Sequence, residues 1–330
     1  MMQVMQVDAG EGLDPLDYER SVLAGAGADL VEGRCTTPEE VLERAQDAQV
    51  LWLAWRPDID RRILTGLPKL ELVVRWGVGY DQIDVRAATE LGVAVANAPD
   101  YGTIDVAEHV LALLLSGSRR VAWYQEQMRR GAWPPAATGC HHRLHGRRLG
   151  IIGVGRIGAA VARRATAFGL DVVGYDPALG ADDLAARGVA PIGLGELLST
   201  SDYLSLHVPL SEATHHFFSA DLIAQVKPGA ALINASRGKV VDTDALIAAL
   251  SRGTLAWTAL DVFEDEPLPA DHPLRTIPQV IMTPHVAGYS EESWQDLRAE
   301  MCLTTVQWVN DGWAERIVNP AVRGNRRAHH

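Results

Sequence analysis

The sequence predicts an α/β protein of two domains in which most strands run parallel. Three observations indicate this. The chain has 330 residues, which is long for a single hydrophobic core. Short apolar runs alternate with helical segments, a pattern typical of parallel sheets covered by helices. One apolar run ends in the glycine-rich turn LGIIGVGRIG (149–158), and a second series of alternating elements starts there.

The overall composition is that of an ordinary globular protein, with 47% hydrophobic and 22% charged residues. A formal net charge of -12 opposes binding to nucleic-acid phosphates or to an anionic membrane surface. No apolar run reaches the length of a membrane helix, and the start MMQVMQV lacks the features of a signal peptide. We therefore expect a cytoplasmic protein with neither a nucleic-acid nor a membrane partner.

The cysteines carry no disulfide or metal spacing, which fits a reducing compartment. They are Cys35, Cys140 and Cys302. One segment, GCHHRLH, does bring soft ligands together: Cys140, His141, His142 and His145. Arginines share this stretch, so we interpret it as a polar loop and expect no metal.

In the first third of the chain, three apolar runs are predicted as buried strands. They are QVLWLAW (49–55), LELVVRW (70–76) and GVAVANAP (92–99). Helical segments separate them: TPEEVLERAQDA (37–48) and two more starting near Asp58 and Asp84. The first of these has a threonine N-cap, a proline at the first helical position and acids in its first turn.

The segment 103–130 is predicted as one long helix or two joined ones, and PPAATG (134–139) ends it. Six strand-like runs follow: LGIIGVGRIG, DVVGYDP, YLSLHVP, AALINAS, WTALDVF and QVIMTP. The last helical segment (290–312) has Ser290 as a plausible N-cap, and we place it back on the first domain. The second domain is then an insertion, with 104–288 lying between 1–103 and 289–330.

The turn after the first run of the second series has the spacing of a dinucleotide-binding site. Gly153, Gly155 and Gly158 form GxGxxG between an apolar run and a helix-like segment. Such glycines permit a tight turn, close approach of the backbone to a pyrophosphate and close helix–strand packing. The N-terminus of the helix then offers free N–H groups to the phosphates.

Asp176 strengthens this interpretation because it ends the next strand, DVVGYDP. A carboxylate there accepts hydrogen bonds from the ribose hydroxyls of the adenosine. It also repels a 2′-phosphate by roughly 4 kcal/mol at about 4 Å and an effective dielectric near 20. The sequence therefore predicts NAD(H) in preference to NADP(H).

Three further segments carry reactive side chains where predicted strands end, the edge at which open α/β sheets bind ligands. They are NASRGKVVD (234–242) with Arg237, DVFEDEPLP (261–269) with four acids, and TPHVAG (283–288) with His285. Any one of these segments alone is compatible with a solvated turn. All three together, following a dinucleotide motif in the chain, indicate a reacting site.

In this order and spacing, LGIIGVGRIG, NASRGKVVD, DVFEDEP and TPHVAG resemble the D-2-hydroxyacid dehydrogenase family. VVRWGVGYDQIDVRAATELGVAVANAP (73–99) looks like the substrate-domain segment of that family, and the similarity spans roughly 49–310. The C-terminal-binding-protein-like and D-3-phosphoglycerate dehydrogenase-like branch looks closest. The resemblance implies two Rossmann-like domains, a doubly wound NAD-binding domain inserted into a flavodoxin-like substrate domain.

The resemblance also implies roles for individual residues. Arg237, Glu266 and His285 would be catalytic, with Glu266 the partner of His285, while Glu264 and Asp265 would face solvent. Asp261 would face the nicotinamide carboxamide. Further cofactor contacts would come from Val106, Arg156, Ile157, His207, Pro209, Thr214, Ala235 and Gly288. The substrate would meet Arg237 and the segment that holds Arg75, Trp76, Val78 and Gly79.

The chemistry has a physical reason for each part. A carbonyl that receives hydride needs a proton donor, and imidazole titrates near neutral pH. A neighbouring Glu266 carboxylate would favour the imidazolium form of His285. Arg237 offers a planar fork for the carboxylate and carbonyl of a 2-keto acid. By the same resemblance, backbone N–H groups around Val78 and Gly79 hold the carboxylate from the other side.

Other functions fit the same residues. One is oxidation of another small anion such as formate or phosphite, and another is a non-catalytic, NADH-sensing corepressor-like protein. The corepressor-like branch carries a tryptophan where this chain has Gly288, which suggests a more open pocket. Arg75 could bind a second anionic group on the substrate or serve within its own domain. The resemblance implies a homodimer with the 103–130 region at the interface.

Overall fold

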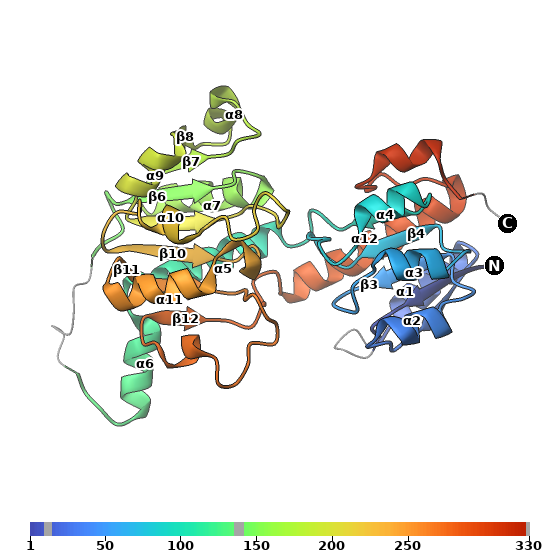
Figure 1. Ribbon diagram of the computed structural model, residues 1–330, viewed down its shortest axis with the longest axis horizontal. Helices are drawn as coiled ribbons and strands as arrows, with labels where there is room; N and C mark the ends of the chain where they lie inside the picture. The colour runs from blue at the N-terminus through green and yellow to red at the C-terminus, as the bar shows by residue number, and fades with distance from the viewer. Residues whose placement is uncertain (10–14, 135–141, 328–330) are drawn as a thin grey trace. The chain divides into compact units, whose positions relative to one another are not determined.

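The computed structural model describes residues 1–9, 15–134 and 142–327. It divides into two compact units, one of Met1–Gly102 with Ser290–His330 and the other of Thr103–Tyr289. Each unit is a parallel β-sheet with helices on both faces (Figure 1). The predicted α/β class with largely parallel strands is confirmed.

The sheet of the first unit has five strands in the order β2-β1-β3-β4-β5, the order of a flavodoxin-like sheet. The strands are β1 (Met2–Gln6), β2 (Ala28–Glu32), β3 (Val50–Leu53), β4 (Leu72–Arg75) and β5 (Ala94–Asn97). The helices and the terminal 3₁₀ turn are α1 (Asp17–Gly25), α2 (Pro38–Arg44), α3 (Arg61–Gly66), α4 (Val85–Glu90), α12 (Glu291–Asp311) and η3 (Pro320–Gly324).

Two hydrophobic layers cover this sheet. Leu23 of α1 and Met301 and Trp308 of α12 pack on one face. Side chains of α2, α3 and α4, among them Val41 and Ile63, pack on the other. The last helix therefore belongs to the core of the first unit. The predicted N-caps hold, since the side chain of Thr37 accepts from Glu40 N–H and that of Ser290 from Ser293 N–H.

Two strands of this sheet were not predicted. In β1 (MQVMQ) glutamines interrupt the apolar pattern, and Gln6 is nevertheless buried because its amide donates to Asp8 Oδ1 at 2.8 Å. The edge strand β2 (ADLVE) keeps Asp29 exposed to solvent. Polar residues at these positions hide the strands from a search for apolar runs.

The second unit has seven strands in the order β12-β11-β10-β9-β6-β7-β8. The strands are β6 (Arg148–Ile152), β7 (Asp171–Tyr175), β8 (Ala190–Pro191), β9 (Tyr203–Leu206), β10 (Ala230–Asn234), β11 (Leu255–Leu260) and β12 (Val280–Met282). The helices and 3₁₀ turns are α5 (Thr103–Ser118), α6 (Val121–Arg129), α7 (Arg156–Ala167), α8 (Ala181–Ala186), α9 (Leu194–Thr200), α10 (Ala220–Ile223), η1 (Gly238–Val240), α11 (Thr243–Arg252) and η2 (Pro273–Thr276).

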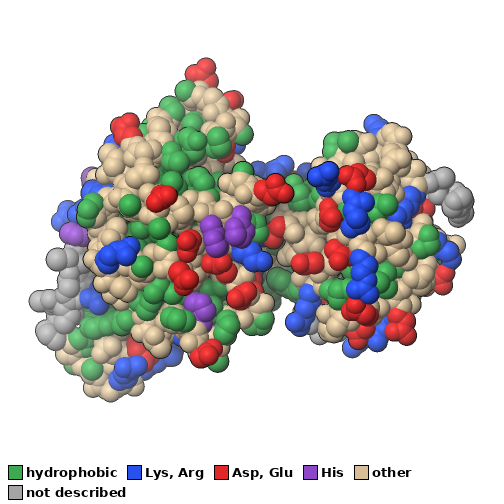
Figure 2. Space-filling view, viewed as in Figure 1, with side chains coloured by type: hydrophobic (Ala, Val, Ile, Leu, Met, Phe, Trp, Pro, Cys, Tyr) green, Lys and Arg blue, Asp and Glu red, His purple; other side chains and the backbone are tan. Residues whose placement is uncertain are grey.

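Helices α5 and α7 contribute to the hydrophobic layer on one face of this sheet, and α9, α10 and α11 to the layer on the other. The predicted helical region 103–130 is two helices, because Arg120 adopts a left-handed conformation (φ 53°) between α5 and α6. Among the described residues, no helix is long and apolar enough to cross a membrane. Figure 2 shows histidine side chains next to acidic ones on the surface of this unit.

Candidate active site

The predicted site residues of the second unit follow the carboxyl ends of neighbouring strands. In sheet order, β12 leads to His285, β11 to Asp261, β10 to Arg237, β9 to His207, β6 to Gly153 and β7 to Asp176. The strands all run parallel, but the order in which the chain adds them reverses between β6 and β9, and open α/β sheets bind their ligands at such a switch point.

The three glycines of the turn after β6 differ in how much room they leave for a side chain. Gly153 has φ +88°, and a Cβ there would lie 2.8 Å from the carbonyl carbon of His207. A Cβ on Gly158 would lie 2.2 Å from the carbonyl oxygen of Gly153. Beside Gly155, in contrast, no atom of the described residues lies within 4 Å of the Cβ position. Gly155 caps α7 without a side chain, so the cradle and the first-turn N–H groups fit a pyrophosphate.

Asp176 lies beside this turn. Its Oδ2 accepts from Val154 N–H at 2.9 Å and its Oδ1 from Ala178 N–H at 2.9 Å. The carboxylate is half-buried and follows β7 directly. Sequence reasoning missed Arg187, whose guanidinium donates to the carbonyl of Val154 and so braces the same turn.

His207 and Thr214 shape the segment after β9. Burial lowers the pKa of His207 to about 4, so its ring is neutral, and Nε2 lies 2.8 Å from Ser205 Oγ. The hydroxyl of Thr214 donates to the carbonyl of Pro209 at 2.6 Å and closes a turn there. The structure therefore brings Pro209 and Thr214 together.

The other predicted cofactor contacts differ in exposure. Arg156 is exposed at the first position of α7, while Ile157 packs against the core of the unit. Val106 is 9% exposed on α5. Ala235 and Gly288 are half-buried, after β10 and in the loop that follows His285.

Asn234 shapes the turn that carries Arg237. Its Oδ1 accepts from Ser236 N–H at 3.0 Å and from Ser236 Oγ at 2.8 Å, and its Nδ2 donates to the carbonyl of Arg237 at 2.9 Å. Asn234 is itself buried, and Arg237 Nη1 donates to the carbonyl of Ser236 at 2.8 Å. The side chain that orients the turn thus lies beneath it.

Gly238 sets the distance between this turn and the acidic loop after β11. A Cβ on Gly238 would lie 1.9 Å from the carbonyl carbon and oxygen of Phe263. No side chain fits there, because the backbone of the acidic loop blocks it. This close contact between the backbones at Gly238 and Phe263 holds the segment of Arg237 next to the segment of Glu266.

Glu266 and His285 are in contact, with Oε2 2.6 Å from Nδ1. The other carboxylate oxygen, Oε1, accepts from Phe263 N–H at 2.9 Å. Burial alone would raise the pKa of Glu266, but the hydrogen bond and charge of His285, the N–H of Phe263 and the charge of Arg237 outweigh it and hold that pKa below its usual range. The contact with Glu266 therefore engages the imidazole ring of His285 through Nδ1.

The prediction that Glu264 faces solvent is wrong, whereas Asp265 is exposed as expected. Glu264 Oε1 accepts from Thr243 N–H at 2.9 Å, and Oε2 lies 2.8 Å from His216 Nε2. The close approach at Gly238 brings the acidic loop to the start of α11, where an unpaired helix N–H favours a carboxylate. Burial would raise the pKa of Glu264, but the bonds from Thr243 and His216 hold it below its usual range.

Asp261 is 0% exposed and holds the loop of His285 from within. Its Oδ1 accepts from Thr283 Oγ1 at 2.6 Å and from Val286 N–H at 3.0 Å, and its Oδ2 accepts from Ala287 N–H at 2.9 Å. Burial would raise the pKa of Asp261, but these bonds and that from His109 hold it below its usual range. Contact of this side chain with a carboxamide stays a prediction.

In the first unit, Arg75 is 4% exposed. Its Nη1 donates to the carbonyl of Trp76, its Nε donates to Gln82 Oε1 at 3.3 Å, and Gly77 lies against its guanidinium. Trp76 is also buried, between Trp52 and Trp294. Neither side chain offers surface to a substrate in this structure.

Val78 and Gly79 are more accessible than Arg75 and Trp76. Both are half-buried, and the carbonyl of Val78 accepts from Asn97 Nδ2 at 2.6 Å. Their N–H groups have no hydrogen-bond partner among the described residues. Arg75 and Asn97 together shape the segment that presents these N–H groups.

The expected absence of metal concerned a cluster that includes Cys140 and His141, which lie outside the described residues. Within residues 1–9, 15–134 and 142–327, no group of three or more His, Cys, Asp or Glu side chains could hold a metal ion.

Residues 111–287, more than half of the chain, match the family described as D-isomer specific 2-hydroxyacid dehydrogenase, NAD binding domain. The chain belongs to this family. This 2-hydroxyacid dehydrogenase is 42% identical over 258 residues to a glyoxylate reductase of Korarchaeum cryptofilum, with 77% of each chain covered. It is 39% identical over 308 residues to a D-3-phosphoglycerate dehydrogenase of Methanocaldococcus jannaschii, covering 93% of this chain and 58% of that one.

A solved structure shares the whole architecture of this dehydrogenase. D-lactate dehydrogenase from Aquifex aeolicus, complexed with NAD and lactic acid, matches with a TM-score of 0.85 and 29% identity, covering 96% of this chain and 99% of that one. The predicted family and the two-domain Rossmann architecture are thereby confirmed, and the protein is an NAD-dependent oxidoreductase acting on 2-hydroxy acids.

Sequence reasoning missed the buried residues that orient the site of this dehydrogenase. Asn234 and Thr283 stand inside the motifs that carry Arg237 and His285, so a search for polar residues next to those motifs could have found them. His109 lies far from both motifs in the chain, and its Nε2 is 3.0 Å from Thr283 Oγ1. Only the fold brings it to the site.

Proposed function

We propose that this dehydrogenase transfers hydride reversibly between NAD(H) and a small 2-keto or 2-hydroxy acid of D configuration, with Arg237, Glu266 and His285 at the reacting centre. The observation that carries the proposal is the 2.6 Å contact between Glu266 and His285, beside the charge of Arg237 and on the same sheet edge as the glycine turn. Proton exchange, anion binding and dinucleotide binding are thus assigned to one edge.

Each residue has a defined part in keto-acid reduction. NADH supplies the hydride when it is bound. Negative charge then develops on the carbonyl oxygen, and His285 donates a proton to it from Nε2 while Glu266 stabilises the imidazolium through Nδ1. Arg237 binds the substrate carboxylate and carbonyl with its planar fork. In the reverse direction neutral His285 accepts the hydroxyl proton.

We assign dinucleotide binding to the unit Thr103–Tyr289, and the substrate loop to the unit of Met1–Gly102 with Ser290–His330. The N–H groups of Val78 and Gly79 suit a substrate carboxylate, since neither has a partner among the described residues. Because Arg75 is buried beneath this segment, we assign it to holding the loop rather than to binding a second anionic group.

The test is consumption of NADH with a panel of acids. Glyoxylate, hydroxypyruvate, pyruvate and phosphonate- and aryl-bearing 2-keto acids form one arm, and NAD⁺ reduction with formate or phosphite forms the other. We expect turnover in the first arm, with a product of D configuration by chiral chromatography. Turnover only with formate or phosphite would show that the protein oxidises another small anion instead. Tight NADH binding without any turnover would indicate a corepressor-like sensor.

The Glu266–His285 contact predicts a change in pH dependence for Glu266→Gln. The pKa of Glu266 is lowered, so in the wild type its charge faces His285 at neutral pH and is lost only as the pH falls through that lowered value. Without the charge the imidazolium is less favoured. The pH at which reduction loses half of its rate should therefore move down, and the oxidation profile should move in the same direction.

The measurement is the pH profile of kcat/KM in both directions for wild type and Glu266→Gln. Asp265→Gln is the matched control, because Asp265 is an exposed acid of the same loop. Superimposable profiles for wild type and Glu266→Gln would contradict the proposed pairing.

We propose that Asp176 selects NAD(H) over NADP(H). Its carboxylate is anchored to the glycine turn through Val154 N–H, where the ribose hydroxyls of a bound dinucleotide would lie. For Asp176→Ser, kcat/KM with NADPH relative to NADH should rise about tenfold or more, after allowing for solvent screening of a half-exposed charge. Asp182→Ser, an exposed acid on α8, should leave the ratio unchanged; the same ratio in both variants would remove Asp176 from cofactor selection.

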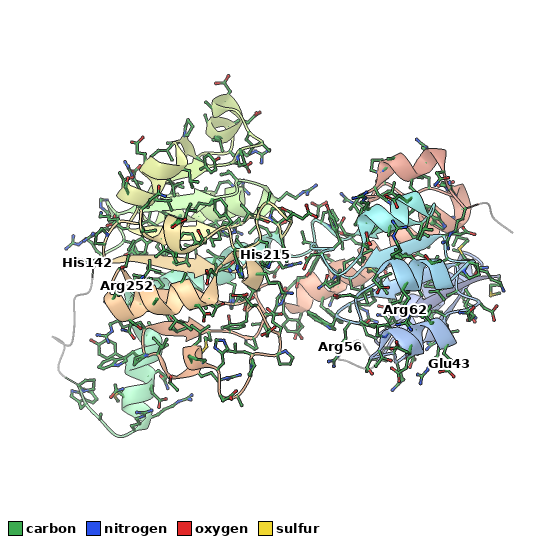
Figure 3. All side chains as sticks on the ribbon, viewed as in Figure 1. Glu43, Arg56, Arg62, His142, His215 and Arg252 are labelled. Atoms are coloured by element: carbon green, nitrogen blue, oxygen red, sulfur yellow. The ribbon has the colours of Figure 1, made fainter. Side chains whose placement is uncertain are left out.

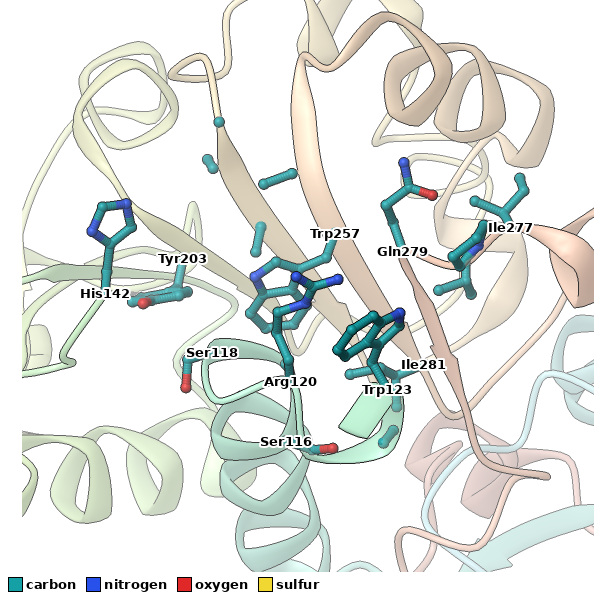
Figure 4. Close-up of a pocket in the computed structure, with 18 of the residues that line it drawn as sticks. Ser116, Ser118, Arg120, Trp123, His142, Tyr203, Trp257, Ile277, Gln279 and Ile281 are labelled. Atoms are coloured by element: carbon teal, nitrogen blue, oxygen red, sulfur yellow. The ribbon is translucent and has the colours of Figure 1, made fainter. Parts of the chain in front are cut away.

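We also propose that the protein forms a homodimer through α6 and the adjoining hollow. No side chain of α6 (Val121–Arg129) is buried, and Trp133 just beyond it is 85% exposed. The hollow, with a volume of about 1140 Å³, has Trp123, Tyr203 and Trp257 in its lining (Figure 4). Aromatic side chains of this kind are enriched at protein interfaces.

Light scattering should give twice the chain mass of 35.8 kDa. Trp123→Glu should shift the protein toward the monomer, because it places a charge among the aromatic side chains of the lining. Phe168→Glu adds the same charge at an exposed aromatic side chain outside the hollow, and it is the control that leaves the dimer intact. A wild-type protein that is monomeric at all concentrations would contradict the proposal.

A further inference from the structure

His109 joins the hydrogen-bond network of the His285 loop from helix α5. Its Nε2 lies 3.0 Å from Thr283 Oγ1 and 3.5 Å from Asp261 Oδ1. Its side chain is 22% exposed, and Val106 lies one helical turn before it. Helix α5 and the loop after β12 are far apart in the chain, so this contact exists only in the folded protein.

The direction of the hydrogen bonds follows from the donors available. The hydroxyl of Thr283 has one proton and donates it to Asp261 Oδ1 at 2.6 Å. At 3.0 Å from that hydroxyl, His109 Nε2 must therefore be the donor, so the ring carries a proton on Nε2. The bonds run from His109 through Thr283 to the buried carboxylate.

The network ends on the backbone of His285. Asp261 binds the loop through Val286 N–H and Ala287 N–H, and its own carbonyl accepts from His285 N–H at 2.7 Å. His285 has φ +54°, a left-handed conformation that few residues other than glycine adopt. Such a conformation persists only where the surrounding contacts enforce it.

We propose that His109 is a positioning residue for His285 and acts through Thr283 and Asp261. The inference deepens the proposed function and rests on it, since it assumes that His285 exchanges the proton. His109 fixes the hydroxyl of Thr283 in its donating orientation, and that orientation supplies a donor to the buried carboxylate. Without His109 the hydroxyl can rotate and Asp261 loses a donor, so the loop loosens around His285.

The experiment compares His109→Leu with His109→Gln, because glutamine keeps an N–H donor and leucine does not. For His109→Leu, kcat should fall about tenfold or more, as expected for a misplaced reacting group, while the Kd for NADH stays within about twofold. His109→Gln should recover to within about threefold of the wild-type kcat. His145→Leu is the matched control, because His145 is an exposed histidine of the same unit outside this network.

A double-mutant cycle tests the route through Thr283. Thr283→Val should have the effect of His109→Leu, and the double variant should be no slower than Thr283→Val alone. Wild-type kcat in His109→Leu, equal losses in His109→Leu and His109→Gln, or additive losses in the cycle would each overturn the proposal.

Amide hydrogen exchange gives a readout that does not depend on turnover. Exchange at Val286 and Ala287 should be faster in His109→Leu than in wild type, and close to wild type in His109→Gln. If the wild type turns over none of the acids, the proposed function is wrong. The exchange rates of Val286 and Ala287 still show in that case whether His109 positions the loop of His285. Unchanged exchange in His109→Leu would overturn the positioning role whatever the substrate.

Discussion

A variant with His285→Gln should lose turnover by about 10²- to 10⁴-fold in both directions, the range for removing a positioned acid–base group. Glutamine is polar but exchanges no proton at neutral pH, and Glu266 would lose its imidazolium partner at 2.6 Å. The Kd for NADH should change little, because the glycine turn and Asp176, to which we assign dinucleotide binding, follow other strands. Steady-state kinetics with NADH titration measures both quantities.

The pair Glu266 and His285 should behave as one unit. In the double variant Glu266→Gln/His285→Gln, kcat should equal that of His285→Gln alone, because the carboxylate acts only through the ring it contacts. His145→Gln makes the same change at an exposed position and should keep wild-type rates. Retention of a tenth or more of the wild-type kcat in His285→Gln would place the acid–base group elsewhere.

Arg237→Ala should cost about 2.7–4 kcal/mol of transition-state stabilisation, or about 10²–10³-fold in kcat, as for loss of one oxyanion donor. In the proposed mechanism the guanidinium binds the carbonyl oxygen on which negative charge develops, so the loss should fall on kcat as well as on KM. Arg237→Lys should recover only part of it, because lysine keeps the charge without the planar fork.

The control for Arg237 is Arg252→Ala, an exposed arginine at the end of α11 in the same unit (Figure 3). Added guanidinium salt should restore part of the rate of Arg237→Ala and none of the rate of His285→Gln. Near wild-type kcat/KM for Arg237→Ala on the preferred acid would remove Arg237 from the mechanism.

Much of the fold could be predicted because its strands are apolar and its helix ends carry local signals. All nine predicted strand runs are strands in the structure. Thr37, Asp84 and Ser290 cap their helices by side-chain bonds to backbone N–H groups three residues ahead. The strands that were not predicted, β1, β2 and the two-residue β8, depend instead on pairing with other strands of their sheets.

Part of the candidate site could also be predicted from the sequence, and part could not. Parallel strands end at one edge of a sheet, so the order of motifs along the chain predicted that Arg237, the acidic loop and His285 would lie at one edge. The pairing of Glu266 with His285 was implied by the family resemblance, and the structure has that contact. The sequence did not show that Glu264 would bind Thr243 and His216, because that contact requires the backbone approach at Gly238. Nor did it show that Arg75 would be buried beneath its own loop.

By itself the sequence determined the fold class and the glycine-rich turn, and it placed the candidate reactive side chains after predicted strands, because periodicity, turn residues and motif spacing are local properties of the chain. The tertiary structure alone decided which buried groups orient those side chains. Asp261, Thr283 and His109 come from two strand ends and a helix, and their hydrogen bonds form only once the sheet and α5 have packed together. A buried polar group needs hydrogen-bond partners, and these can come from any part of the fold. The residues next to it in the sequence therefore do not show which partners it has.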